Sequence, residues 1–245
     1  MPEKEDAFVV FGSATDSPCY AKIISKLDEK GVKSRLAILS AHKTPKELKS
    51  ALKKTTAKIF VAGAGIAAAL PGVVAAETIR PVIGVPCYGA YNGLDAFLSI
   101  HQMPAGVPVI GVGVEATEDA AELVKAYLSG LEKIVLLEPS SDQSHKIMAK
   151  AETQLSELGV KYEKSSSIKL TQLNKAVFIR FVDTLVETVF NDEAVVINVP
   201  VKEGSNEDDA LVVYKMAKKG YWVGLNRAEN AAIAAVQLIN LKGKY

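Results

Sequence analysis

Short apolar runs alternate with amphipathic segments along the first half of this 245-residue chain, and that alternation limits the folds open to it. Five runs have the length of buried strands: 7–12, 33–40, 58–65, 81–86 and 107–114. Four segments have the spacing of helices: 19–31, 44–55, 93–104 and 117–130. Regular alternation predicts an α/β fold, with a parallel sheet covered by helices on both faces. Sites in such folds lie at the carboxyl ends of the strands.

The same order begins again at Lys133. "KIVLLEPSSD" (133–142) resembles "FVVFGSATD" (8–16), and "MAKAETQLSELGVK" (148–161) aligns without gaps with "YAKIISKLDEKGVK" (20–33). Two amphipathic helices can match by chance, but the shared order of strands and helices favours an internal tandem duplication. We therefore predict two domains, 1–130 and 131–245. The second continues with a helix over 172–190, a strand over 193–200 and a final helix over 228–241.

Composition argues against several classes of protein. The chain is 49% hydrophobic and 23% charged with a net charge of +1, so it lacks the excess Lys and Arg of a nucleic-acid binder. Cys19 and Cys87 have the spacing of neither a disulfide framework nor a zinc site, and the three histidines predict no metal. Two uncharged runs, 59–76 and 96–114, approach the length of a membrane span but contain Pro and Gly. With no signal-peptide core at the N-terminus, we expect a cytoplasmic protein that does not contact a membrane.

Three small polar loops follow predicted strands. In "GSATD" (12–16), backbone N–H groups and hydroxyls could hold an anion and Asp16 could bind sugar hydroxyls; the alternative is a helix-capping turn. In "SAHKTP" (40–45), Ser40 and Lys43 suit a phosphate and His42 can exchange a proton near neutral pH. The alternative there is a turn with a structural histidine, in which Thr44 is the N-cap and Pro45 begins the helix. In "AGAGIAAALPG" (62–72), small residues let a planar ligand approach the backbone, although a packed turn would look the same.

Taken in this order, these loops resemble the PurE family of purine biosynthesis. The likeness continues through "PVIGVP" (81–86) and "GLDAFLSIHQMPAGVPV" (93–109) and covers nearly all of residues 7–128. It implies a flavodoxin-like three-layer α/β/α sandwich and an enzyme that makes 4-carboxy-5-aminoimidazole ribonucleotide without a cofactor. One branch of the family is a mutase, which moves the carboxylate of N-carboxyaminoimidazole ribonucleotide to ring carbon four. The other branch carboxylates aminoimidazole ribonucleotide directly with carbon dioxide.

The resemblance implies a role for each loop. Ser13, Thr15 and Asp16 would bind the ribose and phosphate end of the substrate, and Ser40 and Lys43 would hold the phosphate. His42 would be the general acid and base for the proton on carbon four. The loop that contains Ala64, Gly65 and Leu70 would cover the imidazole and the carbon dioxide.

Some residues depart from the family pattern. Lys43 replaces an arginine of the mutase branch, which favours the carboxylase, whereas "AGAGIAA" and "SIHQMPAGVPV" favour the mutase. Ile66 and Ala69 replace a glycine and a histidine, and His101 either compensates for that histidine or packs a helix. We predict a mutase, with direct carboxylation as the alternative. A non-catalytic ribonucleotide-binding or scaffolding protein is the alternative from another class.

The second half lacks the residues that the first would use. Its counterpart of the His42 loop, "SSSIKLTQLNK" (165–175), has no histidine, "NVPVKEG" (198–204) replaces the Gly-Ala loop, and His145 is expected at the surface. We expect this half to be a degenerate repeat that fills a subunit position, so that a homotetramer would imitate the octamer usual in the family.

Overall fold

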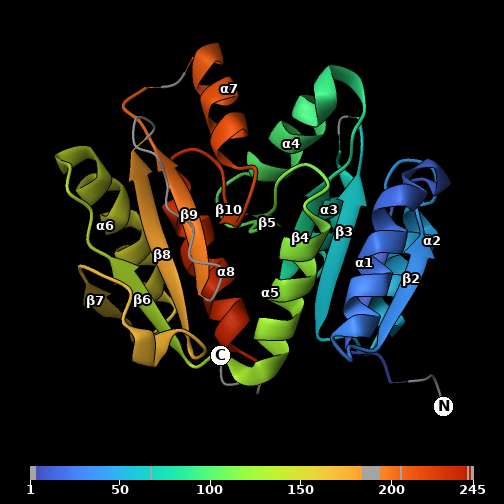
Figure 1. Ribbon diagram of the computed structural model, residues 1–245, viewed down its shortest axis with the longest axis horizontal. Coiled ribbons are helices and arrows are strands. Elements are labelled where there is room, and N and C mark those ends of the chain that lie inside the picture. The colour runs from blue at the N-terminus through green and yellow to red at the C-terminus, as the bar shows by residue number, and fades with distance from the viewer. Residues whose placement is uncertain (1–3, 67, 184–193, 205, 242, 244–245) are drawn as a thin grey trace.

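The computed structural model describes residues 4–66, 68–183, 194–204, 206–241 and 243. Within these residues one ten-stranded sheet has the order β2-β1-β3-β4-β5-β10-β9-β8-β6-β7 (Figure 1). The elements of the first half are β1 (Ala7–Phe11), η1 (Ala14–Asp16), α1 (Ser17–Glu29), β2 (Ser34–Ile38), α2 (Pro45–Lys54), β3 (Ile59–Ala64), α3 (Leu70–Ala76), β4 (Val82–Pro86), η2 (Ala90–Gly93), α4 (Leu94–His101), β5 (Ile110–Gly111) and α5 (Thr117–Gly130). Those of the second half are β6 (Lys133–Leu137), α6 (Asp142–Glu157), β7 (Glu163–Ser165), η3 (Leu170–Gln172), β8 (Ala176–Asp183), β9 (Val195–Val201), α7 (Glu207–Met216), β10 (Tyr221–Trp222) and α8 (Ala228–Ile239).

The first half is a three-layer α/β/α sandwich, as predicted. Strands β1 to β5 pair in parallel, and β1 and β3 are buried on both faces because helices cover each side. Alternate strand residues pack in opposite directions: Val9 and Val61 face α1 and α5, whereas Val10 and Ala62 face α2 and α3. In Figure 1, α1 and α5 lie in front of this part of the sheet.

One predicted element of the second half is wrong. A helix was expected over 172–190, but Ala176–Asp183 forms strand β8, which pairs with β6 and β9; residues 184–190 lie outside the described part. The run "AVFIRFV" is rich in β-branched and aromatic residues and is mostly buried between its neighbours. Periodicity alone does not distinguish such a run from a buried helix, so the pairing partners decided its structure.

The two halves have the same strand order. Outward from their junction the order is β5-β4-β3-β1-β2 in the first half and β10-β9-β8-β6-β7 in the second. They meet at an antiparallel bridge between Gly111 and Trp222. These two residues are also equivalent when "VGVEATEDAA" (112–121) is aligned without gaps to "VGLNRAENAA" (223–232). The bridge therefore pairs equivalent positions, as in a two-fold symmetric dimer.

Hydrogen bonds across the junction run in both directions. The Asp119 carboxylate accepts a bond from the Gly220 N–H at 2.7 Å, and the equivalent Asn230 accepts one from the Gly106 N–H at 2.9 Å. Asn230 is fully buried, and its amide also donates to the carbonyl oxygen of Pro104 at 2.9 Å. Each half thus satisfies a backbone N–H of the other, which ties the halves into one body.

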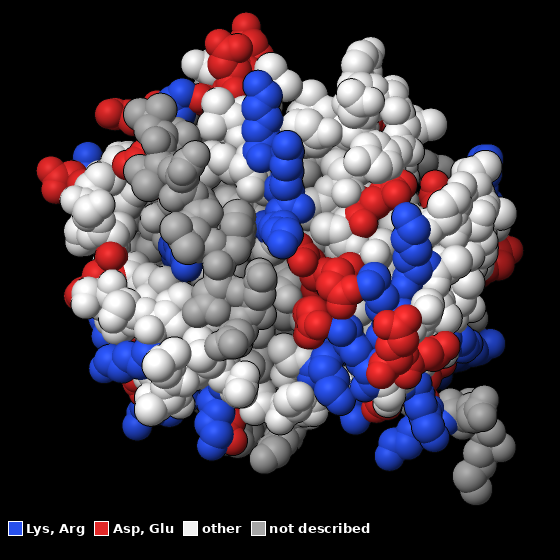
Figure 2. Space-filling view, viewed as in Figure 1, with Lys and Arg blue, Asp and Glu red and all other residues white. Residues whose placement is uncertain are grey.

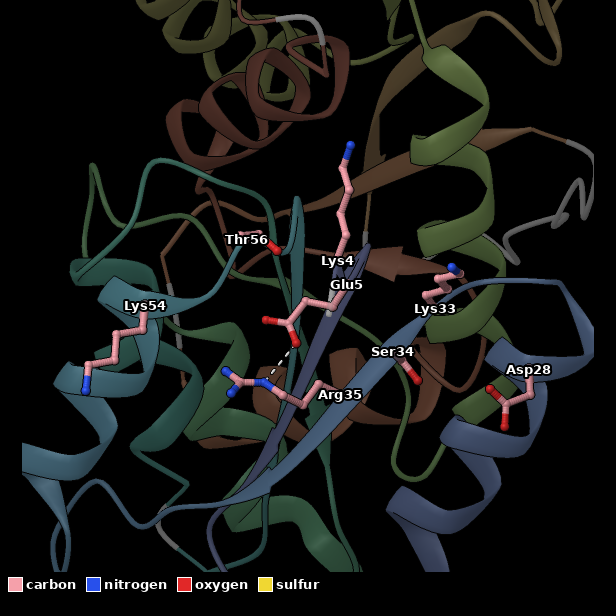
Figure 3. A pocket seen from close by; sticks show the side chains of 8 residues that line it. All are labelled: Lys4, Glu5, Asp28, Lys33, Ser34, Arg35, Lys54 and Thr56. Carbon is pink, nitrogen blue, oxygen red and sulfur yellow. Dashed lines mark ion pairs between the residues drawn. The ribbon is translucent and has the colours of Figure 1, made fainter. Parts of the chain in front are cut away.

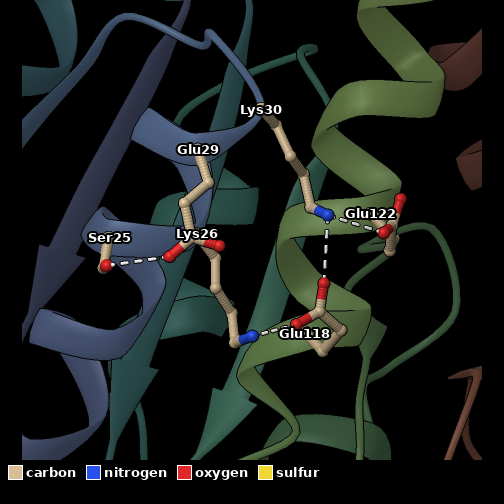
Figure 4. A network of polar contacts seen from close by, with 6 residues as sticks. All are labelled: Ser25, Lys26, Glu29, Lys30, Glu118 and Glu122. Carbon is tan, nitrogen blue, oxygen red and sulfur yellow. Dashed lines mark hydrogen bonds and ion pairs between the residues drawn. The ribbon is translucent and has the colours of Figure 1, made fainter.

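Helices α1 and α5 are joined by a charged network. Lys30 Nζ lies 3.0 Å from Glu118 and 2.6 Å from Glu122, and Lys26 also pairs with Glu118 (Figure 4). These lysines lower the pKa of the Glu118 carboxyl. Figure 2 shows basic and acidic side chains interspersed over this surface. Exposed pairs stabilise little individually, so this network adds little to the packing of α1 on α5.

The two uncharged runs form elements of the sandwich. Residues 59–76 contain β3 and α3, and residues 96–114 contain most of α4 and all of β5. No helix in the described part of the chain is long and apolar enough to cross a bilayer.

Candidate functional site

Strand register brings the predicted loops to one edge of the sheet. Phe11 pairs with both Ile38 and Gly63, and Ala64 pairs with Pro86, so four parallel strands end side by side. The Gly12 N–H donates to the Gly63 carbonyl at 3.2 Å. The loops of residues 12–16, 39–44, 65–69 and 87–93 therefore begin together at this carboxyl edge, as parallel strands require.

The first loop presents a carboxylate and two hydroxyls. Ser13 Oγ lies 2.8 Å from Thr15 Oγ1 and accepts a bond from the Thr15 N–H at 3.2 Å. Asp16 stands at the start of α1 and is partly buried. Burial raises the pKa of Asp16, and the nearby negative charge of Glu115 raises it further. The predicted capping role of this loop is limited to η1, which Ser13 caps.

The second loop is a closed turn that leaves two side chains exposed. Ser40 Oγ accepts bonds from the N–H groups of His42 at 3.3 Å and Lys43 at 3.2 Å. Thr44 occupies the N-cap position and Pro45 begins α2, but the Thr44 hydroxyl bonds the Ser40 backbone instead of the helix. The His42 and Lys43 side chains are exposed, and the Ser40 hydroxyl still has a proton to donate.

The third loop forms the floor of the site. A Cβ placed on Gly12 would lie 3.9 Å from Ala64 Cβ and 4.0 Å from Leu70 Cδ2, so the first and third loops are adjacent. A Cβ on Gly65 would lie 3.4 Å from the Tyr88 carbonyl oxygen, which leaves little room for a side chain. Ile66 follows with φ of 44° and is 72% exposed. Ala64 is buried and Gly65 is half-buried, so this loop exposes Ile66 more than its small residues.

Some helix starts differ between the two halves. Neither α1 nor α2 has a side-chain hydrogen bond at its N-cap within the described residues. In the second half, α6 is capped by Ser141 and α7 by Asn206 in a reciprocal capping box, whereas α8 has no side-chain cap. Uncapped N–H groups and the helix dipole favour an anion, so the starts of α1 and α2 suit a phosphate better than those of α6 and α7.

Comparison with known proteins agrees with this geometry. The model of the AIR carboxylase family matches residues 6–135. The chain belongs to the AIR carboxylase family. An N5-carboxyaminoimidazole ribonucleotide mutase of Methanocaldococcus jannaschii is 43% identical over 121 residues, which cover 49% of this chain and 77% of that protein. The predicted resemblance to PurE proteins is confirmed.

The relatives of this chain are named after two different reactions. A phosphoribosylaminoimidazole carboxylase of Candida albicans is 39% identical over 158 residues, covering 62% of this chain but 28% of that longer protein. Among solved structures, a PurE of Treponema denticola is 29% identical with a TM-score of 0.44, over 50% of this chain and 78% of the other. Both the mutase and the carboxylase branches are thus represented among its relatives.

Two histidines lie away from the strand-end loops. His101 is buried at the junction, where its ring stacks on Phe97 with centroids 3.9 Å apart and Nδ1 lies 2.8 Å from the Phe97 carbonyl oxygen. Gly111 leaves room for its other edge, since a Cβ there would overlap the ring. Burial lowers the pKa of His101 to about 4, so the ring is neutral and packs the helix. His145 is exposed on α6, as predicted.

Three groups near the strand-end loops were not predicted to lie there: Glu115, Cys19 and Cys87. Glu115 follows β5 as Asp16 follows β1, and that parallel position is the signal that could have found it. Cys19 and Cys87 lie close together, and their mutual hydrogen bond and burial raise the pKa of the Cys87 thiol, which stays protonated. Among the described residues, no three His, Cys, Asp or Glu side chains are grouped to hold a metal.

A hollow of about 820 Å³ lies at the opposite, amino-terminal edge of the strands (Figure 3). Arg35 Nε lies 2.8 Å from Glu5 Oε2 there, and its guanidinium stands 4.4 Å from the centre of the Phe8 ring. Figure 3 shows the amines of Lys4, Lys33 and Lys54 pointing apart, so they do not converge on one ligand. This hollow contains none of the residues of the strand-end loops.

Proposed function

We propose that this protein forms 4-carboxy-5-aminoimidazole ribonucleotide in purine biosynthesis, by moving the carboxylate of N-carboxyaminoimidazole ribonucleotide to ring carbon four. The observation that carries the proposal is the meeting of the Ser13, His42 and Ala64 loops at one edge, within the region that matches the family. The relative from Methanocaldococcus jannaschii named as the mutase supports the same reaction.

The chemistry requires one proton to be moved and carbon dioxide to be confined. The carboxylate leaves the exocyclic nitrogen as carbon dioxide, and that nitrogen takes up a proton. Carbon four of the electron-rich ring then bonds to the carbon dioxide and loses its own proton. His42 serves as the acid for the first step and the base for the last, so protons balance without a cofactor. Holding carbon dioxide beside carbon four supplies the remaining rate enhancement.

The other residues bind the substrate. Ser13, Thr15 and Asp16 bind the ribose and phosphate end, because the Ser13 and Thr15 hydroxyls lie 2.8 Å apart after β1 and Asp16 follows them at the start of α1. Ser40 and Lys43 hold the phosphate at the uncapped start of α2, where a hydroxyl proton, an amine and the helix dipole all favour an anion. Ala64, Gly65 and Leu70 line the space for the imidazole and carbon dioxide.

Direct carboxylation of aminoimidazole ribonucleotide with carbon dioxide is the second candidate. Lys43 favours it, because a lysine at this position resembles the direct-carboxylase branch, whereas the mutase branch has an arginine with a bidentate fork. The likeness to the carboxylase of Candida albicans supports it as a family variant.

We further propose that residues 131–245 are a degenerate repeat of residues 1–130. The shared strand order and the junction bonds in both directions support a duplication, and the capped starts of α6 and α7 support the loss of a ligand site. Four chains would then supply eight repeats, in a cytoplasmic homotetramer. Sedimentation equilibrium should give the mass of four chains, and a mass of one or eight chains would refute the assembly.

A paired-substrate assay tests the reaction. The purified protein should convert N-carboxyaminoimidazole ribonucleotide faster than aminoimidazole ribonucleotide with bicarbonate, and the reverse result would favour the carboxylase. His42→Asn should abolish turnover and retain ribonucleotide binding, whereas His145→Asn, an exposed control in the other half, should behave as wild type. Ribonucleotide binding without turnover of either substrate by the wild type would indicate a non-catalytic binding protein.

A further inference from the structure

One hydrogen bond links the second half of the chain to a loop at the site of the first. Tyr214 of α7 donates its hydroxyl to the carbonyl oxygen of Asn92, with the two oxygens 2.8 Å apart. The Tyr214 ring also stands edge-on to Phe97 of α4, with centroids 5.4 Å apart and an interplanar angle of 80°. The ring contact fixes the direction of the hydroxyl, so the bond is well oriented.

The loop that receives this bond has an unfavourable backbone. It follows β4 and contains two successive non-glycine residues with positive φ, Tyr91 at 54° and Asn92 at 56°. Such conformations persist only where surrounding contacts hold them. The Tyr91 side chain is 80% exposed and gives little packing to the loop. The Tyr214 bond is an outside contact that helps to hold this backbone in place.

The same loop lies against the floor of the site. The Tyr88 carbonyl oxygen is 3.4 Å from where a Cβ of Gly65 would stand, and Ile66 Cγ1 is 3.6 Å from where a Cβ of Gly89 would stand. Movement of residues 88–92 would therefore move or release Gly65 and Ile66. Those two residues belong to the loop that would cover the imidazole.

We infer that Tyr214 is a positioning residue for this site, through which the otherwise degenerate second half holds the 88–92 loop against the Gly65 loop. The second half thus contributes to activity and does not only fill space. The inference rests on the proposed function for the kinetic part of its test. In the wild type the 88–92 loop would already be ordered when substrate binds, so less conformational entropy would be lost on binding.

The test compares Tyr214→Phe with Tyr162→Phe. Both substitutions remove one hydroxyl from the second half. Within the described residues, the Tyr162 hydroxyl has a hydrogen bond only to the Glu152 carboxylate, at 3.4 Å, which lies in the same half. Loss of one hydrogen bond corresponds to about a fivefold change in an equilibrium, so amide exchange over residues 88–93 should rise about fivefold in Tyr214→Phe. KM should rise, by at most about fivefold, with kcat within about twofold, because substrate binding must then supply the free energy that orders the loop.

The outcomes are distinct. A purely structural role would reduce the folded fraction, which lowers kcat and leaves KM unchanged, and that result would overturn the inference. Unchanged exchange over residues 88–93, or an equal rise in Tyr162→Phe, would also overturn it. If the wild type turns over neither substrate, the proposed function fails, and the exchange measurement alone then decides whether Tyr214 holds the loop.

Discussion

Lowering the pH from 8 to 5 should destabilise the wild-type protein by about 2 kcal/mol more than a His101→Gln variant. His101 is 3% exposed, and burial lowers its pKa from 6.5 to about 4, with the bond to the Phe97 carbonyl opposing that shift. In the unfolded chain the ring takes up a proton near pH 6.5, whereas in the folded chain it does so only near pH 4. Between these values the unfolded state binds more protons, so stability falls as the pH falls.

The magnitude follows from linkage. Between the two pKa values the His101 ring is protonated only in the unfolded state, so the free energy of unfolding falls by about 1.4 kcal/mol for each pH unit. The total loss is about 2 kcal/mol at pH 5 and roughly 3 kcal/mol below pH 4. Glutamine can replace the bond to Phe97 and does not titrate. Comparing pH slopes instead of absolute stabilities removes the cost of the substitution itself and the contribution of the other titrating groups.

Urea unfolding followed by tryptophan fluorescence measures this difference. Trp222 is the single tryptophan of the chain and is fully buried beside Phe97 at the junction, so its emission reports the region that contains His101. His145→Gln is the matched control, because it removes an exposed histidine and should keep the wild-type slope. Parallel pH profiles for wild type and His101→Gln would show that the ring is not neutral and buried, and would refute the reasoning.

Three further predictions concern the site and the junction. Glu115→Gln should move the acid limb of the pH profile of substrate binding to lower pH, because it removes one of the two causes that raise the pKa of Asp16. An unchanged limb would show that the charge of Glu115 does not act on the Asp16 carboxyl. Asn230→Ala should lower the free energy of unfolding in urea by about 2 kcal/mol, because the Gly106 N–H loses its acceptor at the junction; a change within error would mean that water replaces the amide. Ile66→Gly should raise the free energy of unfolding by about 0.5 kcal/mol. Relief of the positive φ at this position slightly exceeds the entropy that glycine adds to the unfolded chain. A loss above about 1 kcal/mol would instead show that the Ile66 side chain packs in the native state.

Much of the site could be predicted from local sequence. Residues 12–16, 40–45 and 65–72 each follow a strand that is recognisable from its apolar run, and parallel pairing requires such loops to share one edge. Pro45 as the first residue of α2 was likewise readable, because proline needs no partner for an N–H at that position. The helix-capping interpretation of Thr44 was incomplete, since a competing backbone partner, Ser40, lies four residues away.

What the sequence by itself determined is the order of strands and helices in the first half, the loops that carry His42 and Asp16, and the membership of a family. The elements and loops depend on interactions between neighbours in the chain, and membership of the family depends on residue identity. Tertiary structure alone decided that 176–183 is a strand, that His101 is buried and neutral, and that Tyr214 reaches Asn92 across 122 positions. Burial and pairing depend on which distant elements pack together, and local periodicity contains no information about those partners.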